Sequence, residues 1–127
     1  MSEHAKTKSL MARGCAFLCR ETAILCGAMS WVSERNLVSA ISNAGGFGVI
    51  ACGAMTPELL DAEIAATRAL TEGPFGVNLI TMHPMLFDLI EACARHRVSH
   101  VVLAGGIPPK GSVEAIKASG AKVICFA

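Results

Sequence analysis

The chain has 127 residues, the length of one domain with room for a core. Hydrophobic residues make up 53% and charged residues 17%, which excludes disorder and favours a buried parallel sheet covered by helices. The net charge of +1 comes without a basic stripe, so neither nucleic acid nor a membrane surface is expected as a partner. No apolar run reaches membrane-spanning length and the first residues are polar, so we expect a cytoplasmic protein without a signal peptide.

The N-terminal residues 1–22 are expected to form an extension, frayed over 1–8 and helical over 9–20. Apolar strand-like runs then alternate with helical patterns to the end of the chain. Strands are predicted at 23–26, 47–52, 75–80, 100–104 and 122–126. Helices are predicted at 33–43, 57–70, 84–96 and 112–118. Helix-start signals support these bounds: Ser33 and Thr56 as N-caps, and Pro57 and Pro84 as first helical residues.

Strict alternation of strand and helix with short connections predicts a parallel sheet with right-handed crossovers. Two architectures fit this α/β pattern. One is an open doubly wound sheet, which five strands would complete. The other is a (β/α)8 barrel, which needs about 250 residues and would be only half present. Periodicity alone does not separate the two.

Small and polar residues follow the predicted strands at the edge where parallel α/β proteins bind ligands. Gly27, Ala28 and Met29 follow the first strand, where small residues either expose amide groups to a flat heterocycle or merely form a tight turn. Asn78 lies in the apolar third strand, where its amide bonds either a ligand ring edge or another part of the protein. Trp31, the one tryptophan, is either an anchor between helix and sheet or a ring that stacks on a ligand.

Further candidates follow the third and fourth strands. Gly105 and Gly106 either admit a ligand close to the backbone or make a sharp turn, and His83 is a possible polar contact at the same edge. His96 and His100 are expected to be structural. Cysteines occur without a Cys-x-x-Cys pair, so we expect buried or half-buried thiols in a reducing compartment and predict no metal site. They stand at positions 15, 19, 26, 52, 93 and 125.

Four segments together resemble the amino-terminal half of the nitronate monooxygenase family, formerly called 2-nitropropane dioxygenase. FMN-dependent enoyl-acyl-carrier-protein reductases share nearly all of these segments. They are Gly27-Ala28-Met29-Ser30-Trp31-Val32-Ser33, Ser42-Asn43-Ala44-Gly45-Gly46-Phe47-Gly48, Leu70-Thr71-Glu72-Gly73-Pro74-Phe75-Gly76-Val77-Asn78-Leu79 and Ala121-Lys122-Val123-Ile124.

The resemblance implies a (β/α)8 barrel that binds FMN and oxidises nitronates with O2 to a carbonyl compound and nitrite. It implies that Gly27, Ala28 and Met29 line the flavin ring through backbone contacts and that Asn78 hydrogen-bonds the flavin. Gly105 and its neighbour Gly106 would border the substrate side, where we also place His83. The alternative enzyme is an enoyl-acyl-carrier-protein reductase that uses NAD(P)H and FMN.

The family's active-site histidine belongs to a Gly-His-x-Gly-like loop beyond the fifth strand, and its FMN phosphate is held by later glycine-rich turns. Neither occurs in residues 1–127. We therefore expect a truncated chain, a single partial flavin-binding barrel domain over 1–127, with no catalytic residue of its own and no activity alone. Its exposed sheet edges predict that it dimerises, aggregates or binds FMN weakly. A non-catalytic half-barrel is the remaining alternative.

Overall fold

The computed structural model describes residues 3–126, and its core is a sheet of four parallel strands in the order β1-β2-β3-β4. The strands are β1 Gly48–Ala51, β2 Phe75–Ile80, β3 His100–Ala104 and β4 Lys122–Cys125. The helices are α1 Glu3–Leu18, α2 Arg35–Asn43, α3 Pro57–Leu70, α4 Leu86–Arg95 and α5 Ser112–Ala118. Helices follow β1, β2 and β3 in turn, so the predicted parallel alternation is confirmed.

The first expected strand, at 23–26, does not form a regular strand. Leu25 makes only an isolated parallel bridge with Phe47. The Cys26 N–H donates to the Phe47 carbonyl at 2.9 Å, and the Phe47 N–H donates to the Ile24 carbonyl at 2.9 Å. The chain then enters the turn that begins at Gly27, so the ladder ends after one bridge. The sheet therefore has four strands and a bridge where five strands were expected.

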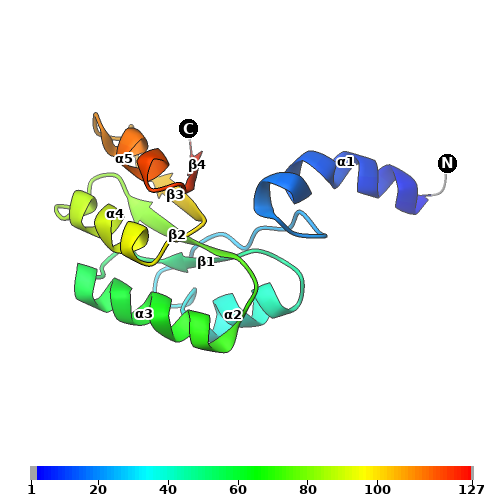
Figure 1. Ribbon diagram of the computed structural model, residues 1–127, viewed down its shortest axis with the longest axis horizontal. Coiled ribbons are helices and arrows are strands. Elements are labelled where there is room, and N and C mark those ends of the chain that lie inside the picture. Colours follow the sequence, from blue (N-terminus) through cyan, green and yellow to red (C-terminus); the bar gives the residue numbers. More distant parts are fainter. Residues whose placement is uncertain (1–2, 127) are drawn as a thin grey trace.

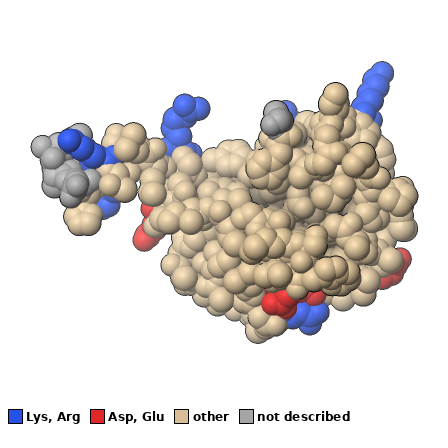
Figure 2. Space-filling model, turned by 180° about the vertical axis from the view of Figure 1, so that it is seen from behind, with Lys and Arg blue, Asp and Glu red and all other residues tan. Residues whose placement is uncertain are grey.

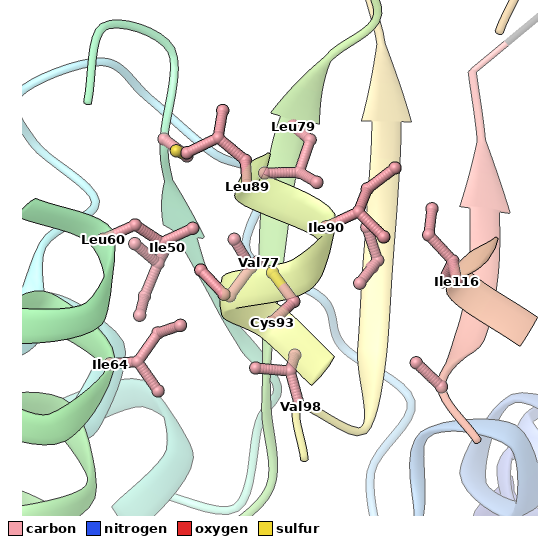
Figure 3. Packing of buried hydrophobic residues seen from close by; sticks show 14 of the residues in the cluster. Ile50, Leu60, Ile64, Val77, Leu79, Leu89, Ile90, Cys93, Val98 and Ile116 are labelled. Carbon is pink, nitrogen blue, oxygen red and sulfur yellow. The ribbon is translucent and has the colours of Figure 1, made fainter. Parts of the chain in front are cut away.

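Helices α2 to α5 cover one face of this sheet (Figure 1). Strand residues that point to this face, such as Ile50, Val77 and Leu79, are fully buried. They pack with α4 residues such as Leu89 and Cys93 in the main hydrophobic core (Figure 3). Burial of these side chains is what fixes the strands, because alternate residues of each strand are apolar on this face.

The opposite face of the sheet carries a smaller core, in which Phe47, Val49 and Val102 pack with Leu18 from the end of α1. The last turn of α1 also gives its Phe17 carbonyl to two donors from the sheet, His100 Nε2 at 2.7 Å and Lys122 Nζ at 2.5 Å. These contacts pair a helix-terminal carbonyl that has no partner within the helix. They hold the C-terminal end of α1 on the face that α2 to α5 leave open.

Several helix bounds differ from the expected ones. Helix α1 begins at Glu3 and ends at Leu18, so the predicted fraying is wrong over residues 3–8, while residues 1–2 lie outside the described part. The N-cap of α2 is Glu34, whose carboxylate accepts from the N–H groups of Asn36 and Leu37, in place of Ser33. The Thr56 cap of α3, followed by Pro57, is confirmed.

Helix α4 begins at Leu86, two residues after the expected start at Pro84. His83 Nδ1 accepts a hydrogen bond from the Met85 N–H at 3.0 Å, and this bond lies just before the first residue of the helix.

In the described part, no helix is long and apolar enough to cross a membrane. The face shown in Figure 2 carries its charged side chains towards its margins, with an uncharged middle.

Candidate functional site

A hollow of about 250 Å³ lies at the carboxyl ends of β1, β2 and β3, on the face opposite the helices. We call it the strand-end hollow. Its lining comes from the segment around residues 25–30, from positions of β1 to β3 and the loop after β1, and from Phe126, just past β4. The lining residues are Leu25, Gly27, Ala28, Ser30, Val49, Ala51, Gly53, Asn78, Ile80, Val102, Ala104 and Phe126. Gly27, Ala28 and Asn78, three residues singled out from the sequence, thus share one hollow.

Asn78 occupies the centre of β2 and is only 7% exposed. Its Nδ2 donates to the Val102 carbonyl of β3 at 3.1 Å, which also fixes the orientation of the amide because a carbonyl can only accept. Among the described residues no donor is paired with Asn78 Oδ1. The structural bond considered in the sequence analysis therefore exists, and it leaves one acceptor available in a residue that lines the hollow.

The turn from Gly27 to Ser33 is held by hydrogen bonds around the Ser33 side chain. Ser33 Oγ accepts from the Met29 N–H at 2.9 Å and donates to the Gly27 carbonyl at 3.4 Å. The Met29 carbonyl accepts from the N–H groups of Val32 at 3.1 Å and Ser33 at 2.8 Å. Ser33 is buried and its own carbonyl accepts from the Ala51 N–H at 3.0 Å, so the turn is fastened to β1. This use of Ser33 replaces the helix-capping role expected for it.

The same hydrogen bonds leave several donors of the turn without a protein acceptor. In the described part of the chain, the backbone N–H groups of Gly27, Ala28 and Ser30 are paired with no acceptor. All three residues line the strand-end hollow. Backbone N–H groups are strong donors that need water or a ligand where the protein supplies no acceptor. The residues that line the hollow therefore include three whose backbone donors are available.

Neither a close contact within the described residues nor the backbone angle requires glycine at position 27. A Cβ built at Gly27 would meet no heavy atom within 4 Å. Gly27 is also absent from the glycines with positive φ, so its backbone does not demand glycine. The space in front of Gly27 is therefore open, which suits a flat ligand lying close to the backbone.

Met29 and Trp31 stand apart from this arrangement. Met29 belongs to the same turn but does not line the hollow; its side chain is 45% exposed and its N–H is already bound to Ser33. Its contact with a flavin stays a prediction. Trp31 is 82% exposed, so the interpretation of this residue as an anchor between helix and sheet is wrong.

The substrate-side candidates lie at the same end of the sheet but outside the hollow. Gly105 and Gly106 have positive φ values of 98° and 131°, which only glycine adopts readily. Gly106 lines a separate shallow depression together with Phe126, a residue that also lines the strand-end hollow. His83 uses Nδ1 to hold the Met85 N–H, so the structure gives it a local role, and it does not line the hollow. Substrate contacts by these residues stay predictions.

His96 and His100 have protein partners, as expected of structural residues. His96 Nε2 lies 2.9 Å from Asp61 Oδ1, and His100 is buried between Phe17 and Phe47.

Burial raises the thiol pKa of Cys52 to about 11 and of Cys93 to about 12, so neither is a nucleophile at neutral pH.

Cys19 and Cys125 are exposed, which contradicts the expectation that all the cysteines are buried or half-buried. Between residues 3 and 126, no three His, Cys, Asp or Glu side chains gather in a way that could hold a metal ion.

Sequence reasoning missed Ser33 and Gly53. Gly53 lies two residues after the end of β1 and lines the hollow beside Ser30, whose Oγ would lie 3.4 Å from a Cβ built at Gly53. A glycine just after a strand was the available signal, since the same signal identified Gly27. Ser33 gave no comparable signal, because its partners are set by the folded turn.

Parallel strands alternate with helices that cover one face, and a hollow lies at the strands' carboxyl ends on the other face; this arrangement matches part of a (β/α)8-barrel protein. The family model described as "Nitronate monooxygenase" matches residues 15–127. The chain therefore belongs to the nitronate monooxygenase family, whose members are flavin-dependent oxidoreductases. The resemblance seen in the sequence and the barrel-type fold are thereby confirmed.

Individual relatives match parts of the chain. A (3aS,4S,5R,7aS)-5-hydroxy-7a-methyl-1-oxo-octahydro-1H-indene-4-carboxyl-CoA dehydrogenase from Mycobacterium tuberculosis is 39% identical over 98 residues, which are 76% of this chain and 27% of that protein. A nitronate monooxygenase from Paraburkholderia phytofirmans is 40% identical over 60 residues, which are 47% of this chain and 16% of that protein. The chain thus spans about a quarter or less of the length of these two relatives.

Solved structures agree on the fold. FabK from Thermotoga maritima aligns with a TM-score of 0.86 and 37% identity, over 91% of this chain and 37% of that chain. A nitroalkane oxidase from Streptomyces ansochromogenes aligns with a TM-score of 0.74 over 82% of this chain and 40% of that chain. Its identity of 22% supports the fold alone.

Proposed function

We propose that the strand-end hollow forms the flavin-ring side of an FMN site in an oxidoreductase of nitronate monooxygenase type, which oxidises nitronates with O2 to a carbonyl compound and nitrite. One observation carries the proposal: N–H groups without acceptors at Gly27 and Ala28 stand beside open space and beside Asn78. A flat heterocycle that carries both hydrogen-bond donors and acceptors matches this set of groups. Membership of a flavin-dependent family supports FMN as that heterocycle.

The residues of the hollow would bind and orient the ring. The Gly27 and Ala28 N–H groups donate to its acceptor atoms, and Asn78 Oδ1 accepts from a ring N–H while Nδ2 stays on the Val102 carbonyl. Because Ser33 fastens the turn, these donors are positioned before the ligand arrives, which lowers the entropy cost of binding. When bound, FMN supplies the electron transfer, and the protein supplies orientation and electrostatics.

The substrate would approach from the side of Gly105, Gly106 and His83. The two glycines form a turn without side chains, which leaves room for a substrate near the backbone. His83 has its Nδ1 occupied, so Nε2 is the ring nitrogen that it can offer to a polar substrate.

A second candidate is a flavin-dependent enzyme acting on a thioester, such as an enoyl-acyl-carrier-protein reductase. The observation that favours it is the extent of the likeness: 98 residues match the CoA-thioester dehydrogenase from M. tuberculosis, against 60 for the nitronate monooxygenase from P. phytofirmans. FabK also aligns over nearly the whole chain.

Binding is tested by titrating FMN into the purified 127-residue chain and following flavin fluorescence. We expect weak but saturable quenching. In Gly27→Val the added side chain enters the open space, so FMN binding should fall by about tenfold or more while the fold is kept, because a Cβ there meets no protein atom.

The matched control is Ala62→Leu, which adds bulk at an exposed position of α3 outside the hollow. Its FMN affinity should equal that of the wild type, and thermal unfolding of all variants checks the fold. Equal FMN binding by Gly27→Val and the wild type would reject the placement of the flavin. Tight one-to-one binding by a monomer would contradict the expected weakness.

The two reactions are separated with the protein encoded by the complete reading frame that contains this chain. Nitrite release from a nitronate in the presence of O2 supports the first candidate. NADH oxidation that depends on a crotonyl thioester supports the second. FMN binding with neither reaction would leave the non-catalytic alternative of the sequence analysis.

A further inference from the structure

A second hollow, of about 280 Å³, lies beside the strand-end hollow. It opens between the turn at residues 30–34, the loop that follows β1 and the first turns of α3. We call it the side hollow. Its lining residues are Ser30, Trp31, Ser33, Glu34, Ala51, Gly53, Ala54, Met55, Leu59 and Glu63.

The side hollow is chemically apolar even though two carboxylates border it. Both carboxylates already have partners: Glu34 accepts from the N–H groups that begin α2, and Glu63 is bound by Arg35 through the backbone N–H at 2.6 Å and the guanidinium at 2.6 Å. What remains for a ligand is the apolar surface of Trp31, Met55 and Leu59. The lining therefore suits an uncharged hydrocarbon group.

The backbone of Trp31 is also unusual. Its φ of 63° lies in the left-handed region, which is rare for a bulky side chain, and the turn's hydrogen bonds hold it there. Packing of the ring against the protein does not offset this backbone strain, since Trp31 is 82% exposed. Strained residues of this kind cluster at ligand sites, because the surrounding structure holds them for a purpose other than packing.

The two hollows are neighbours. Ser30, Ala51 and Gly53 line both of them, so the side hollow adjoins the proposed flavin position. A whole drug-sized ligand usually takes about 300–1,000 Å³, so the side hollow fits part of a molecule better than all of it. A ligand whose reacting end lies at the strand-end hollow would therefore carry its other end close to the side hollow.

We infer that the side hollow binds the uncharged hydrocarbon part of the substrate, with Trp31 as one wall. The inference rests on the proposed function, since it takes the reacting end of that substrate to lie at the flavin. It selects substrates with an apolar group over small, fully polar ones.

Trp31 is the sole tryptophan, so intrinsic fluorescence reports on the side hollow without a label. The probes are cyclohexanol and, as the polar match with the same carbon ring, inositol, each titrated into the purified chain. Cyclohexanol should give a saturable blue shift of the Trp31 emission, and inositol should give none. Absence of a saturable shift with cyclohexanol, or an equal shift with inositol, would overturn the inference.

Two variants localise the probe. Ala54→Phe fills the side hollow and should weaken the cyclohexanol response by about tenfold or more, because the added ring removes the apolar area that the probe would bury. Leu59→Asp, at an exposed position of the same wall, should also weaken the cyclohexanol response. This second variant serves as the test if Ala54→Phe proves unstable. The control is Ile107→Ser, an exposed apolar residue outside this lining, which should respond as the wild type does. Undiminished responses in the first two variants would place the probe elsewhere.

FMN titration of the same samples separates the two proposals. Cyclohexanol binding without FMN binding would leave a hydrocarbon site whose link to a flavin substrate is rejected along with the proposed function. FMN binding without cyclohexanol binding would reject only the side hollow.

Discussion

At the scale of single residues, the sequence is most informative where a side chain differs in polarity from its neighbours in the chain. Asn78 could be predicted as a site residue because an amide in an apolar strand needs partners, and the structure shows one partner and one available acceptor. Ser33 could not be predicted correctly, because capping α2 and binding the Met29 N–H are both local options for a serine. The Ala51 N–H, a donor from β1, helps to hold Ser33 in the second arrangement.

Glu63 should make the stability of the chain sensitive to acid. Burial of its carboxylate opposes ionisation, but the hydrogen bonds and the charge of Arg35 outweigh burial and lower the pKa of Glu63 below its ordinary value of 4.5. The folded chain therefore keeps Glu63 ionised to lower pH than the unfolded chain does. The stabilisation is present above about pH 4.5 and is lost as the pH falls through the lower folded-state pKa.

Glu63→Gln should accordingly lower the free energy of unfolding by about 1–3 kcal/mol at pH 7, with a smaller difference at pH 3. Urea unfolding at the two pH values measures this. Glu114→Gln, at an exposed position of α5, is the control and should be close to neutral at both. A Glu63→Gln effect that does not shrink in acid would show that the charge of Glu63 is not what stabilises the fold.

At the scale of elements, the four strands of the sheet were predictable within one or two residues because their apolar runs are bounded by turns. The helix start at residue 3 was not, since the first residues are polar and mixed in charge and show no apolar stripe. The run at 23–26 looked like the others, but the turn from Gly27 to Ser33 begins too early for a longer ladder. The position of α1 was also beyond the sequence, because it depends on contacts with β3 and β4.

His100 should couple the docking of α1 to pH. Its Nε2 must carry a proton to donate to the Phe17 carbonyl, so in the neutral ring Nδ1 accepts from Ser99 Oγ at 2.9 Å. Burial lowers the pKa of His100 below its ordinary value of 6.5, and the Lys122 charge adds to this, although the Phe17 hydrogen bond acts in the opposite direction. The unfolded chain thus takes up the proton first as the pH falls, so this contribution to stability is present above about pH 6.5 and is lost below it.

His100→Gln keeps a side-chain donor but does not titrate. We expect it to cost about 1–3 kcal/mol at pH 8 and to flatten the loss of stability that the wild type shows between pH 7 and pH 5. Thermal unfolding across this pH range measures the difference between the two proteins, in which the other histidines cancel. Parallel pH profiles would contradict the assignment.

At the scale of the whole molecule, the sheet is open. Within residues 3–126, strand β4 is paired only with β3, and the face opposite the helices is covered only in part, by the last turn of α1 and by the segment around Leu25 and Ala28. Phe126, just past β4, is 59% exposed. Unpaired strand edges and exposed apolar groups favour association with another chain. The homo-oligomer therefore stays a prediction, and the edge of β4 is where we expect its interface.

Phe126→Lys should raise the monomer fraction of the purified chain by placing a charge at this edge. Leu70→Lys, at an exposed apolar position at the end of α3, is the control and should leave the distribution unchanged. Sedimentation velocity over a range of concentrations measures both. A wild type that is monomeric at every concentration, or equal effects of the two substitutions, would argue against association through β4.

The fastening of α1 also constrains how the chain acquires its structure during synthesis. Phe17 is bonded by Lys122, a residue 105 positions later. At the usual pace of translation, about 5–20 residues per second, these partners leave the ribosome roughly 5–20 s apart. Helix α1 therefore cannot complete this contact until β4 has emerged. Nascent chains halted before residue 122 should bind chaperones through this helix more than chains that extend past β4 do.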